Sequence, residues 1–214
     1  MSKEQDRYQK YAAAYDRSSE ECQWYGPQVL FGLMYRYVRA GEKLLDLGIG
    51  TGLGSEDFHR AGLEVFGMDS SQSMLAECRK KGIARDLRQH SLIDVPWPYS
   101  DGAFDHVIST GVTHFLGELN EVIEEVARIL KPGGIFGFDV SEYGSADDAK
   151  YTSLAEGVYT RVEEDWGHTV YCHTPDYIMK VLSDNHFKVE CDTEFLVSRE
   201  PKRYFRMLIC RLVS

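Results

Sequence analysis

The feature that most constrains the fold is an apolar run that ends in a glycine-rich turn. Residues 44–54 are Leu-Leu-Asp-Leu-Gly-Ile-Gly-Thr-Gly-Leu-Gly, with glycine at every second position from residue 48. Glycine adopts positive φ without strain and lets a ligand approach the backbone. A helix that begins after such a turn points unpaired N–H groups into the same space. The run therefore predicts a buried strand and a nucleotide-type binding turn in an α/β fold.

Two details of the turn argue against a dinucleotide ligand. The spacing is G-x-G-x-G, and Leu53 stands where the fingerprint G-x-G-x-x-G needs a glycine. Asp46 lies two residues before the first glycine, where a carboxylate repels a pyrophosphate and attracts a cationic ligand. A role for Asp46 as a cap of the turn alone is the alternative.

A second carboxylate follows the first glycine by about 20 residues, where nucleotide-binding sheets place a ribose-binding acid. Residues 64–68 predict the next strand, and Asp69 ends it. The two oxygens of Asp69 match the paired 2′ and 3′ hydroxyls of an adenosine. Asp69 as a helix N-cap only is the alternative.

These motifs resemble those of the class I S-adenosylmethionine (SAM)-dependent methyltransferases: Asp46-Leu-Gly-Ile-Gly-Thr-Gly52, followed by Gly67-Met-Asp-Ser-Ser71. The resemblance is good from Gly41 to Val140. It implies a Rossmann-like three-layer α/β sandwich with a seven-stranded, mostly parallel sheet whose last strand is antiparallel. It also implies SAM as the methyl donor, a small-molecule acceptor and S-adenosylhomocysteine (SAH) as the product.

Strand and helix patterns alternate along the chain, which predicts a parallel sheet with helices on both faces. The two strands expected at 187–197 and 204–212 are joined by six residues. Since a parallel return needs a longer crossover, this pair must be antiparallel. Strands are also expected at 44–47, 64–69, 84–92, 104–110, 135–140, 158–162 and 168–171, and helices at 5–18, 27–38, 54–62, 72–81, 118–130 and from 174.

We expect one domain over residues 1–214, in four parts. These are an N-terminal helical cap (1–40), a SAM-binding core (41–140), an inserted hairpin that covers the substrate (141–173), and a C-terminal helix with the antiparallel strand pair (174–214).

The resemblance assigns the cofactor contacts to the carboxyl end of the sheet and to the N-terminal segment. Ser91 stands where the family often has Asp or Asn for the adenine amino group; a backbone contact from Leu92 would survive that change. Met74 packs against the adenine or belongs to the core. The expected cofactor-binding residues are Tyr15, Asp46, Gly48, Gly50, Thr51, Gly52, Asp69, Ser70, Met74, Ser91, Leu92, Ser109 and Thr110.

The N-terminal helix is expected to carry an aromatic face. Tyr8, Tyr11 and Tyr15 recur at i, i+3 and i+7. Such a face with few aliphatic neighbours is a poor core element but a workable lid over a cationic ligand, because ring faces attract cations. A solvated helix is the alternative.

His114 is the candidate catalytic residue, in a loop that should border the methyl group. With an unperturbed pKa of about 6.5, a histidine there suits a general base. A packing or capping histidine is the alternative. Direct displacement from a sulfonium needs alignment and exclusion of water, and a base only for a protic acceptor. The expected substrate-pocket residues are Tyr11, His114, Tyr171 and His173, with His168 as a comparable candidate.

The composition of the chain argues against several classes of partner and site. The net charge of −10 disfavours a nucleic-acid substrate, because nucleic-acid affinity depends on cationic contacts to phosphates. No apolar run reaches the about 20 residues of a membrane span, and the start of the chain lacks a signal-peptide segment. The five cysteines contain no C-x-x-C, and Cys172-His173 lacks metal-ligand spacing.

We therefore expect a cytoplasmic enzyme without a metal and leave its oligomeric state open. A non-catalytic SAM-binding module is one alternative function. An NAD(P)-dependent oxidoreductase is the other, and both Leu53 and Asp46 disfavour it.

Overall fold

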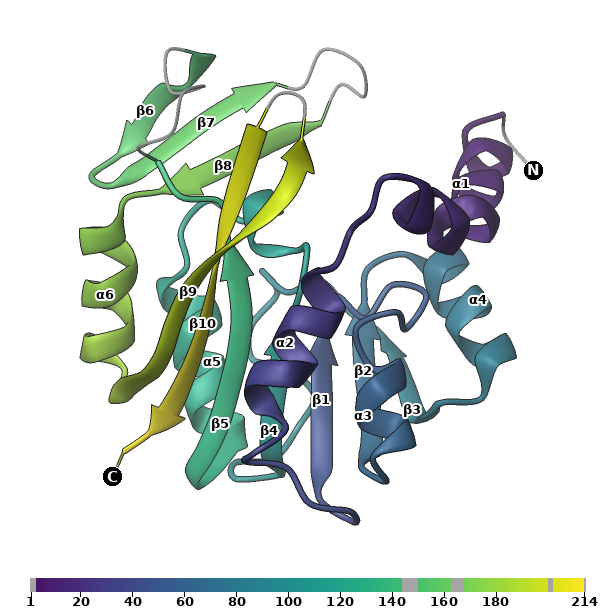
Figure 1. The fold of residues 1–214 in the computed structure, drawn as a ribbon, viewed down its shortest axis with the longest axis horizontal. Coiled ribbons are helices and arrows are strands. Elements are labelled where there is room, and N and C mark those ends of the chain that lie inside the picture. Colours follow the sequence, from purple (N-terminus) through teal and green to yellow (C-terminus); the bar gives the residue numbers. More distant parts are fainter. Residues whose placement is uncertain (1–2, 144–149, 163–167, 200–201, 214) are drawn as a thin grey trace.

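The centre of the molecule is a seven-stranded sheet in the order β3-β2-β1-β4-β5-β10-β9. A computed structural model describes residues 3–143, 150–162, 168–199 and 202–213. β10 runs antiparallel to both of its neighbours, whereas β1 to β5 pair in parallel (Figure 1). The expected fold class is confirmed. The strands are β1 (Lys43–Leu47), β2 (Glu64–Asp69), β3 (Ala84–Gln89), β4 (Phe104–Ser109), β5 (Leu130–Val140), β9 (Phe187–Arg199) and β10 (Lys202–Leu212).

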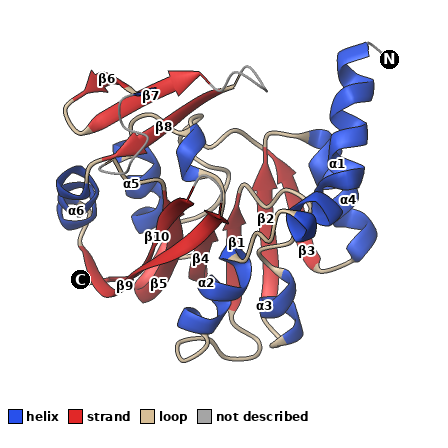
Figure 2. Ribbon diagram, turned by 45° about the horizontal axis from the view of Figure 1, so that its top comes forward, coloured by secondary structure: helices blue, strands red, loops and turns tan. Residues whose placement is uncertain are grey.

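Helices cover both faces of this sheet, as the alternation predicts (Figure 2). One face carries α2 (Gly26–Met34), α3 (Glu56–Arg60) and α4 (Gln72–Lys81). The other face carries α5 (Asn120–Ile129) and α6 (Pro175–Asp184). The N-terminal α1 (Lys3–Glu21) contacts α4.

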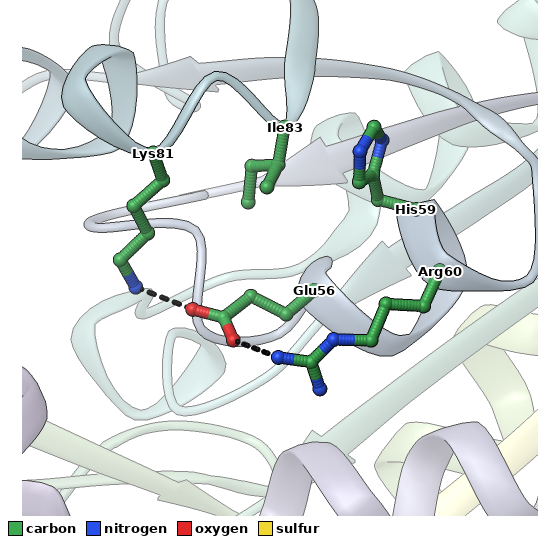
Figure 3. A pocket seen from close by; sticks show the side chains of 5 residues that line it. All are labelled: Glu56, His59, Arg60, Lys81 and Ile83. Atoms are coloured by element: carbon green, nitrogen blue, oxygen red, sulfur yellow. Dashed lines mark hydrogen bonds and ion pairs between the residues drawn. The ribbon is translucent and has the colours of Figure 1, made fainter.

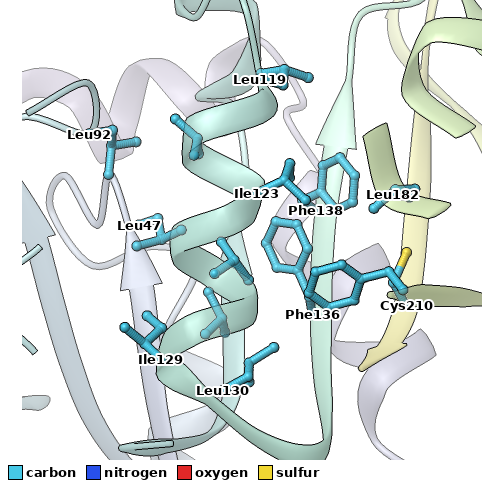
Figure 4. Packing of buried hydrophobic residues seen from close by; sticks show 14 of the residues in the cluster. Leu47, Leu92, Leu119, Ile123, Ile129, Leu130, Phe136, Phe138, Leu182 and Cys210 are labelled. Carbon is cyan, nitrogen blue, oxygen red and sulfur yellow. The ribbon is translucent and has the colours of Figure 1, made fainter. Parts of the chain in front are cut away.

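The core between α5 and the sheet follows from the apolar stripe of that helix. Val122, Ile123, Val126 and Ile129 recur at helical spacing and are all buried. They pack in one cluster with two stacked rings of β5, Phe136 and Phe138, whose centroids are 4.4 Å apart (Figure 4). This packing fixes β5 beside β4.

The glycine turn lies against β2 at a position where no side chain fits. Gly67 pairs with Asp46 of β1, and a Cβ built on Gly67 would lie 2.4 Å from Cδ1 of Ile49. Gly67 therefore lets Ile49, and with it the turn, sit directly on the sheet.

We expect Gly67→Ala to destabilise the protein by about 1–3 kcal/mol, because the added methyl has to displace Ile49 in a packed core. The matched control is Gly32→Ala on the exposed side of α2, where nothing lies within 4 Å of the new Cβ. That control should stabilise the protein by up to about 1 kcal/mol. Urea unfolding measures both; equal stabilities would contradict the tight packing of Ile49.

A second, three-stranded sheet follows β5. It contains β6 (Thr152–Ala155), β7 (Val158–Val162) and β8 (Thr169–His173). The antiparallel β7–β8 pair confirms the expected hairpin, whose turn at 163–167 lies outside the described residues. β6 was not expected. This sheet and α1 both lie at the end of the central sheet where the parallel strands end (Figure 1).

Several boundaries differ from the expectations. α2 ends at Met34 rather than at residue 38, because the exposed Tyr35 and its neighbours form a turn. β3 ends at Gln89 rather than at residue 92. β5 begins at Leu130, and a register shift opposite β4 accommodates the segment around Gly133, which has φ +79°.

Candidate functional site

The turn after β1 has the backbone shape that its glycines predict. Gly48, Gly50 and Gly52 have φ values of +70°, +55° and +88°. A Cβ on Gly48 would meet Val112 at 2.6 Å, and one on Gly52 would meet Ile83 at 2.6 Å. A Cβ on Gly50 would have no neighbour closer than 3.9 Å. The outer two glycines therefore allow close packing, and the middle one leaves its backbone open to a ligand.

Asp69, at the end of β2, holds this turn in place. Its Oδ2 accepts from the backbone N–H of Gly50 at 2.9 Å, and its Oδ1 accepts from that of Ser71 at 2.7 Å. Burial raises the pKa of Asp69, and the two N–H bonds oppose the rise. Each carboxylate oxygen can accept a further bond. The N-cap of α4 is Ser71, so the interpretation of Asp69 as that cap is wrong.

Asp46 is buried beneath the turn. Its Oδ2 accepts from Oγ of Ser55 at 2.6 Å. Burial raises the pKa of Asp46 to about 7, the Ser55 bond opposes the rise, and the charge of Asp69 adds to it. A Cβ on Gly54 would lie 3.2 Å from both Oδ2 of Asp46 and Oγ1 of Thr110. The carboxyl group therefore both supports the turn and faces the loop that follows β4.

A further carboxyl group at this end of the sheet, that of Asp139, is fully buried and was not among the predicted residues. It lies near the end of β5, and both of its oxygens accept from the backbone N–H of Gly111, at 3.0 and 2.9 Å. Burial raises its pKa to about 7, and the Gly111 bonds oppose the rise. An acid at the end of a predicted strand was the signal that identified Asp46 and Asp69, and it applies equally to Asp139.

The raised pKa of Asp139 predicts that its contribution to stability depends on pH. Between pH about 4 and about 7 the unfolded carboxyl group is ionised while the folded one keeps its proton. This contribution is therefore complete below pH about 4 and is lost as the pH rises through about 7. We expect the excess stability of the wild type over Asp139→Asn to shrink across this range, measured by urea unfolding. A constant difference would contradict the raised pKa.

The C-terminal half of α1 is tied to the turn and to α4. Oγ1 of Thr51 donates to Oδ1 of Asp16 at 2.5 Å, and Nζ of Lys81 lies 2.5 Å from Oδ2 of Asp16. Lys81 also pairs with Glu56 at 2.7 Å, and Arg60 binds the same carboxylate (Figure 3). Neither Asp16 nor Lys81 was a predicted site residue, because their proximity depends on how α1 and α4 pack.

Tyr15 of α1 lies close enough to Asp139, near the end of β5, for the two charges to interact. Burial raises the pKa of Tyr15 to about 12, and the charges of Tyr11, Asp16 and Asp139 raise it further. A hydrogen bond with Ser19 has the opposite effect and lowers this pKa. The rings of Tyr11 and Tyr15 meet edge to face at 5.7 Å. The side chain of Tyr8 lies outside the described residues.

His114 lies in the short helix η1 (Thr113–Phe115) after β4. The centroid of its ring lies 4.1 Å from that of Phe115 and 5.8 Å from that of Phe205. Its Nδ1 is buried without a hydrogen-bond partner. Burial lowers the pKa of His114 to about 4. The expectation of an ordinary histidine pKa is therefore wrong, and the imidazole is neutral at physiological pH.

The two predicted pocket residues of β8 attach the small sheet to the loop after η1. His173 is fully buried, and its Nε2 donates to the carbonyl oxygen of Gly117 at 2.6 Å. A Cβ on Gly117 would lie 3.3 Å from the ring of Tyr171. His168 is exposed, with its ring 6.4 Å from that of Phe115.

The remaining predicted cofactor residues lie along the same end of the sheet. Oγ of Ser109 donates to the carbonyl oxygen of Leu47 at 3.0 Å, so this hydroxyl is already bonded within the protein. The carbonyl oxygen of the buried Leu92 accepts from Trp97 at 3.1 Å. Ser70 is exposed, and Met74 and Ser91 are half-buried.

Within the described residues, the helices are all too short or too polar to cross a bilayer.

The comparisons with known proteins agree with this geometry. Residues 45–138 match the methyltransferase domain family. A demethylmenaquinone methyltransferase of Paenarthrobacter aurescens is 35% identical over 98 residues, which cover 45% of this chain and 38% of that protein. A malonyl-[acyl-carrier protein] O-methyltransferase of Legionella pneumophila is 27% identical over 177 residues, covering 80% of this chain and 57% of that protein. The chain thus spans less than two thirds of the length of these relatives.

Solved structures share the fold at low sequence identity. A putative methyltransferase of Haloferax volcanii, in complex with the Trm112 methyltransferase activator, superposes with a TM-score of 0.75 at 19% identity, covering 98% of this chain and 97% of that one. The [4+2]-cyclase SpnF superposes with a TM-score of 0.70 at 18% identity, covering 87% of this chain and 81% of that one. The fold is therefore shared by proteins with different chemistry.

Proposed function

We propose that the chain, whose residues 45–138 match the methyltransferase domain family, transfers a methyl group from SAM to a small molecule. The observation that carries the proposal is the open backbone of Gly50 beside the carboxylate of Asp69. A nucleoside needs such a pair, because its ribose hydroxyls donate to a carboxylate while its remaining atoms pass close to the turn. When bound, SAM supplies a methyl group on a positively charged sulfur.

The chain's own residues would bind and orient this ligand. Asp69 accepts from the ribose hydroxyls with the lone pairs that Gly50 and Ser71 leave free. Asp46 and Asp139 lie buried at the ends of β1 and β5, where a cationic ligand favours their ionised forms. Tyr15 closes the site from α1 and excludes water.

The acceptor side is supported by the relatives and by charge. A demethylmenaquinone methyltransferase and a malonyl-[acyl-carrier protein] O-methyltransferase are among the similar proteins, and the net charge of −10 opposes binding to phosphate backbones. We assign residues 1–40 to the cap, 41–140 to SAM binding, 141–173 to the substrate cover and 174–214 to the end of the sheet.

The free cysteines of the described chain suit the reducing cytoplasm, which we propose as its location.

A role of the same site without methyl transfer is the second candidate. The cyclase with this fold supports it, because the same architecture occurs there in a protein named for other chemistry. Methyl-labelled SAM incubated with the protein and a small-metabolite extract distinguishes the two. Label in the small-molecule fraction supports the methyltransferase, whereas tight SAM binding without transfer supports the second candidate.

We expect SAM and SAH to raise the melting temperature, and NAD to leave it unchanged. A ligand at a hundred times its dissociation constant adds about 2.7 kcal/mol, which corresponds to several degrees for a domain of this size. Differential scanning fluorimetry measures the shifts. Stabilisation by NAD, or tight sequence-specific binding to duplex DNA or RNA, would contradict the proposal.

A further inference from the structure

Five rings from four separate segments meet beside the loop that follows β4, and we call them the aromatic wall: Trp24, His114, Phe115, Phe195 and Phe205. Trp24, between α1 and α2, lies 5.8 Å from Phe195 of β9 and 6.0 Å from Phe205 of β10, measured between ring centroids. Phe205 lies 5.8 Å from His114, which lies 4.1 Å from Phe115. The rings therefore form one continuous series.

The aromatic wall borders the proposed cofactor site. A Cβ built on Gly111 would lie 3.4 Å from the Trp24 ring. The backbone N–H of the same Gly111 donates to both oxygens of Asp139. The same loop thus contacts both the buried carboxyl group of Asp139 and the aromatic wall.

His114 gives the wall one polar atom that the protein does not satisfy. Its Nδ1 is buried and has no hydrogen-bond partner. A buried polar atom without a partner is unfavourable, because it has lost its hydrogen bonds to water and gained none, so it calls for an explanation. A ligand hydroxyl or amide that bonds to this nitrogen would remove the cost.

We infer that the aromatic wall binds the methyl acceptor, and that the acceptor presents an uncharged aromatic ring whose hydroxyl group bonds to Nδ1 of His114. The inference rests on the proposed function. Aromatic rings favour an aromatic partner through edge-to-face and offset contacts. Burying a charged group among aromatic rings costs far more than burying a hydroxyl does.

Four probes of similar size separate the parts of this inference, each titrated calorimetrically into SAH-saturated protein. 4-Ethylphenol has the ring and the hydroxyl, ethylbenzene lacks the hydroxyl, 4-ethylcyclohexanol lacks the aromatic ring, and 4-ethylbenzoate adds a charge. We expect 4-ethylphenol to bind at least about fivefold more tightly than each of the others, which is the size of one net hydrogen bond or ring contact.

Two variants assign the preferences to residues. His114→Phe should lose the preference for 4-ethylphenol over ethylbenzene and keep that over 4-ethylcyclohexanol, and His114→Gln should retain part of the hydroxyl preference. Phe205→Leu should lose the preference for 4-ethylphenol over 4-ethylcyclohexanol and keep the preference over ethylbenzene. His59→Phe, on the exposed side of α3, is the matched control and should change neither ratio.

Equal binding of 4-ethylphenol and 4-ethylcyclohexanol, or a hydroxyl preference that survives in His114→Phe, would overturn the inference while leaving the proposed function intact. Tight binding of 4-ethylbenzoate would overturn it as well. Failure of the wild type to bind SAH in the first titration would instead refute the proposed function, and this inference with it.

Discussion

Removal of residues 1–16 should leave the central sheet folded, abolish methyl transfer and weaken SAM binding at least about tenfold. Among residues 11–16, whose side chains the structure describes, only Ala12 is buried. The deleted segment does contribute Asp16, which binds Thr51 and Lys81, and the facing rings of Tyr11 and Tyr15. A ring face is worth about 0.5–2 kcal/mol to a cation, so two rings account for a tenfold loss.

Circular dichroism and calorimetry of the truncated protein measure folding and affinity separately, and amide exchange of α1 should slow when SAM binds to the full chain. Tyr15→Leu should reproduce part of the loss, whereas Arg17→Ala, on the exposed side of α1, should not. If the truncated protein unfolds, α1 is a core element. Unchanged affinity would make it a solvated tail.

Asp69→Ala should cost the protein about 1.5–3 kcal/mol of SAM affinity, the value of charge-assisted hydrogen bonds. This is about ten- to 150-fold in dissociation constant. The variant loses the acceptor for the ribose and releases the N–H of Gly50, so the open backbone is no longer held in place.

Calorimetric titration with both SAM and SAH checks the assignment. The two ligands have the same ribose, so both should weaken by a similar factor. Asp57→Ala on α3, which removes a surface ion pair with Arg60, is the control. A folded Asp69→Ala protein that binds SAM as tightly as the wild type would show that the ribose assignment is wrong.

The sequence predicts most of the fold because the relevant signals are local. Apolar periodicity identifies α5, and the six residues between the last two strands determine their antiparallel pairing. β6 was missed because Thr152–Ala155 is short and mostly exposed, with no alternating pattern. The continuous β5 was missed because its irregular start is accommodated by a register shift in its partner β4.

The site is less predictable because it depends on contacts between distant segments. Asp46 and Asp69 can be identified from the sequence by their positions at the ends of strands. The role of Asp16, in contrast, arises only when α1 lies against α4. The neutral state of His114 is likewise a result of burial among rings from other elements. No local pattern contains that information.

The three acids at the ends of β1, β2 and β5 have a consequence for product inhibition. Asp46, Asp69 and Asp139 are all held in surroundings that raise their pKa values, so each gains from a positive charge nearby. A methyl donor of this class is cationic at sulfur, and its demethylated product is neutral there. We therefore expect the site to bind the proposed cationic donor more tightly than its neutral product through charge alone, which would favour turnover when the two accumulate together.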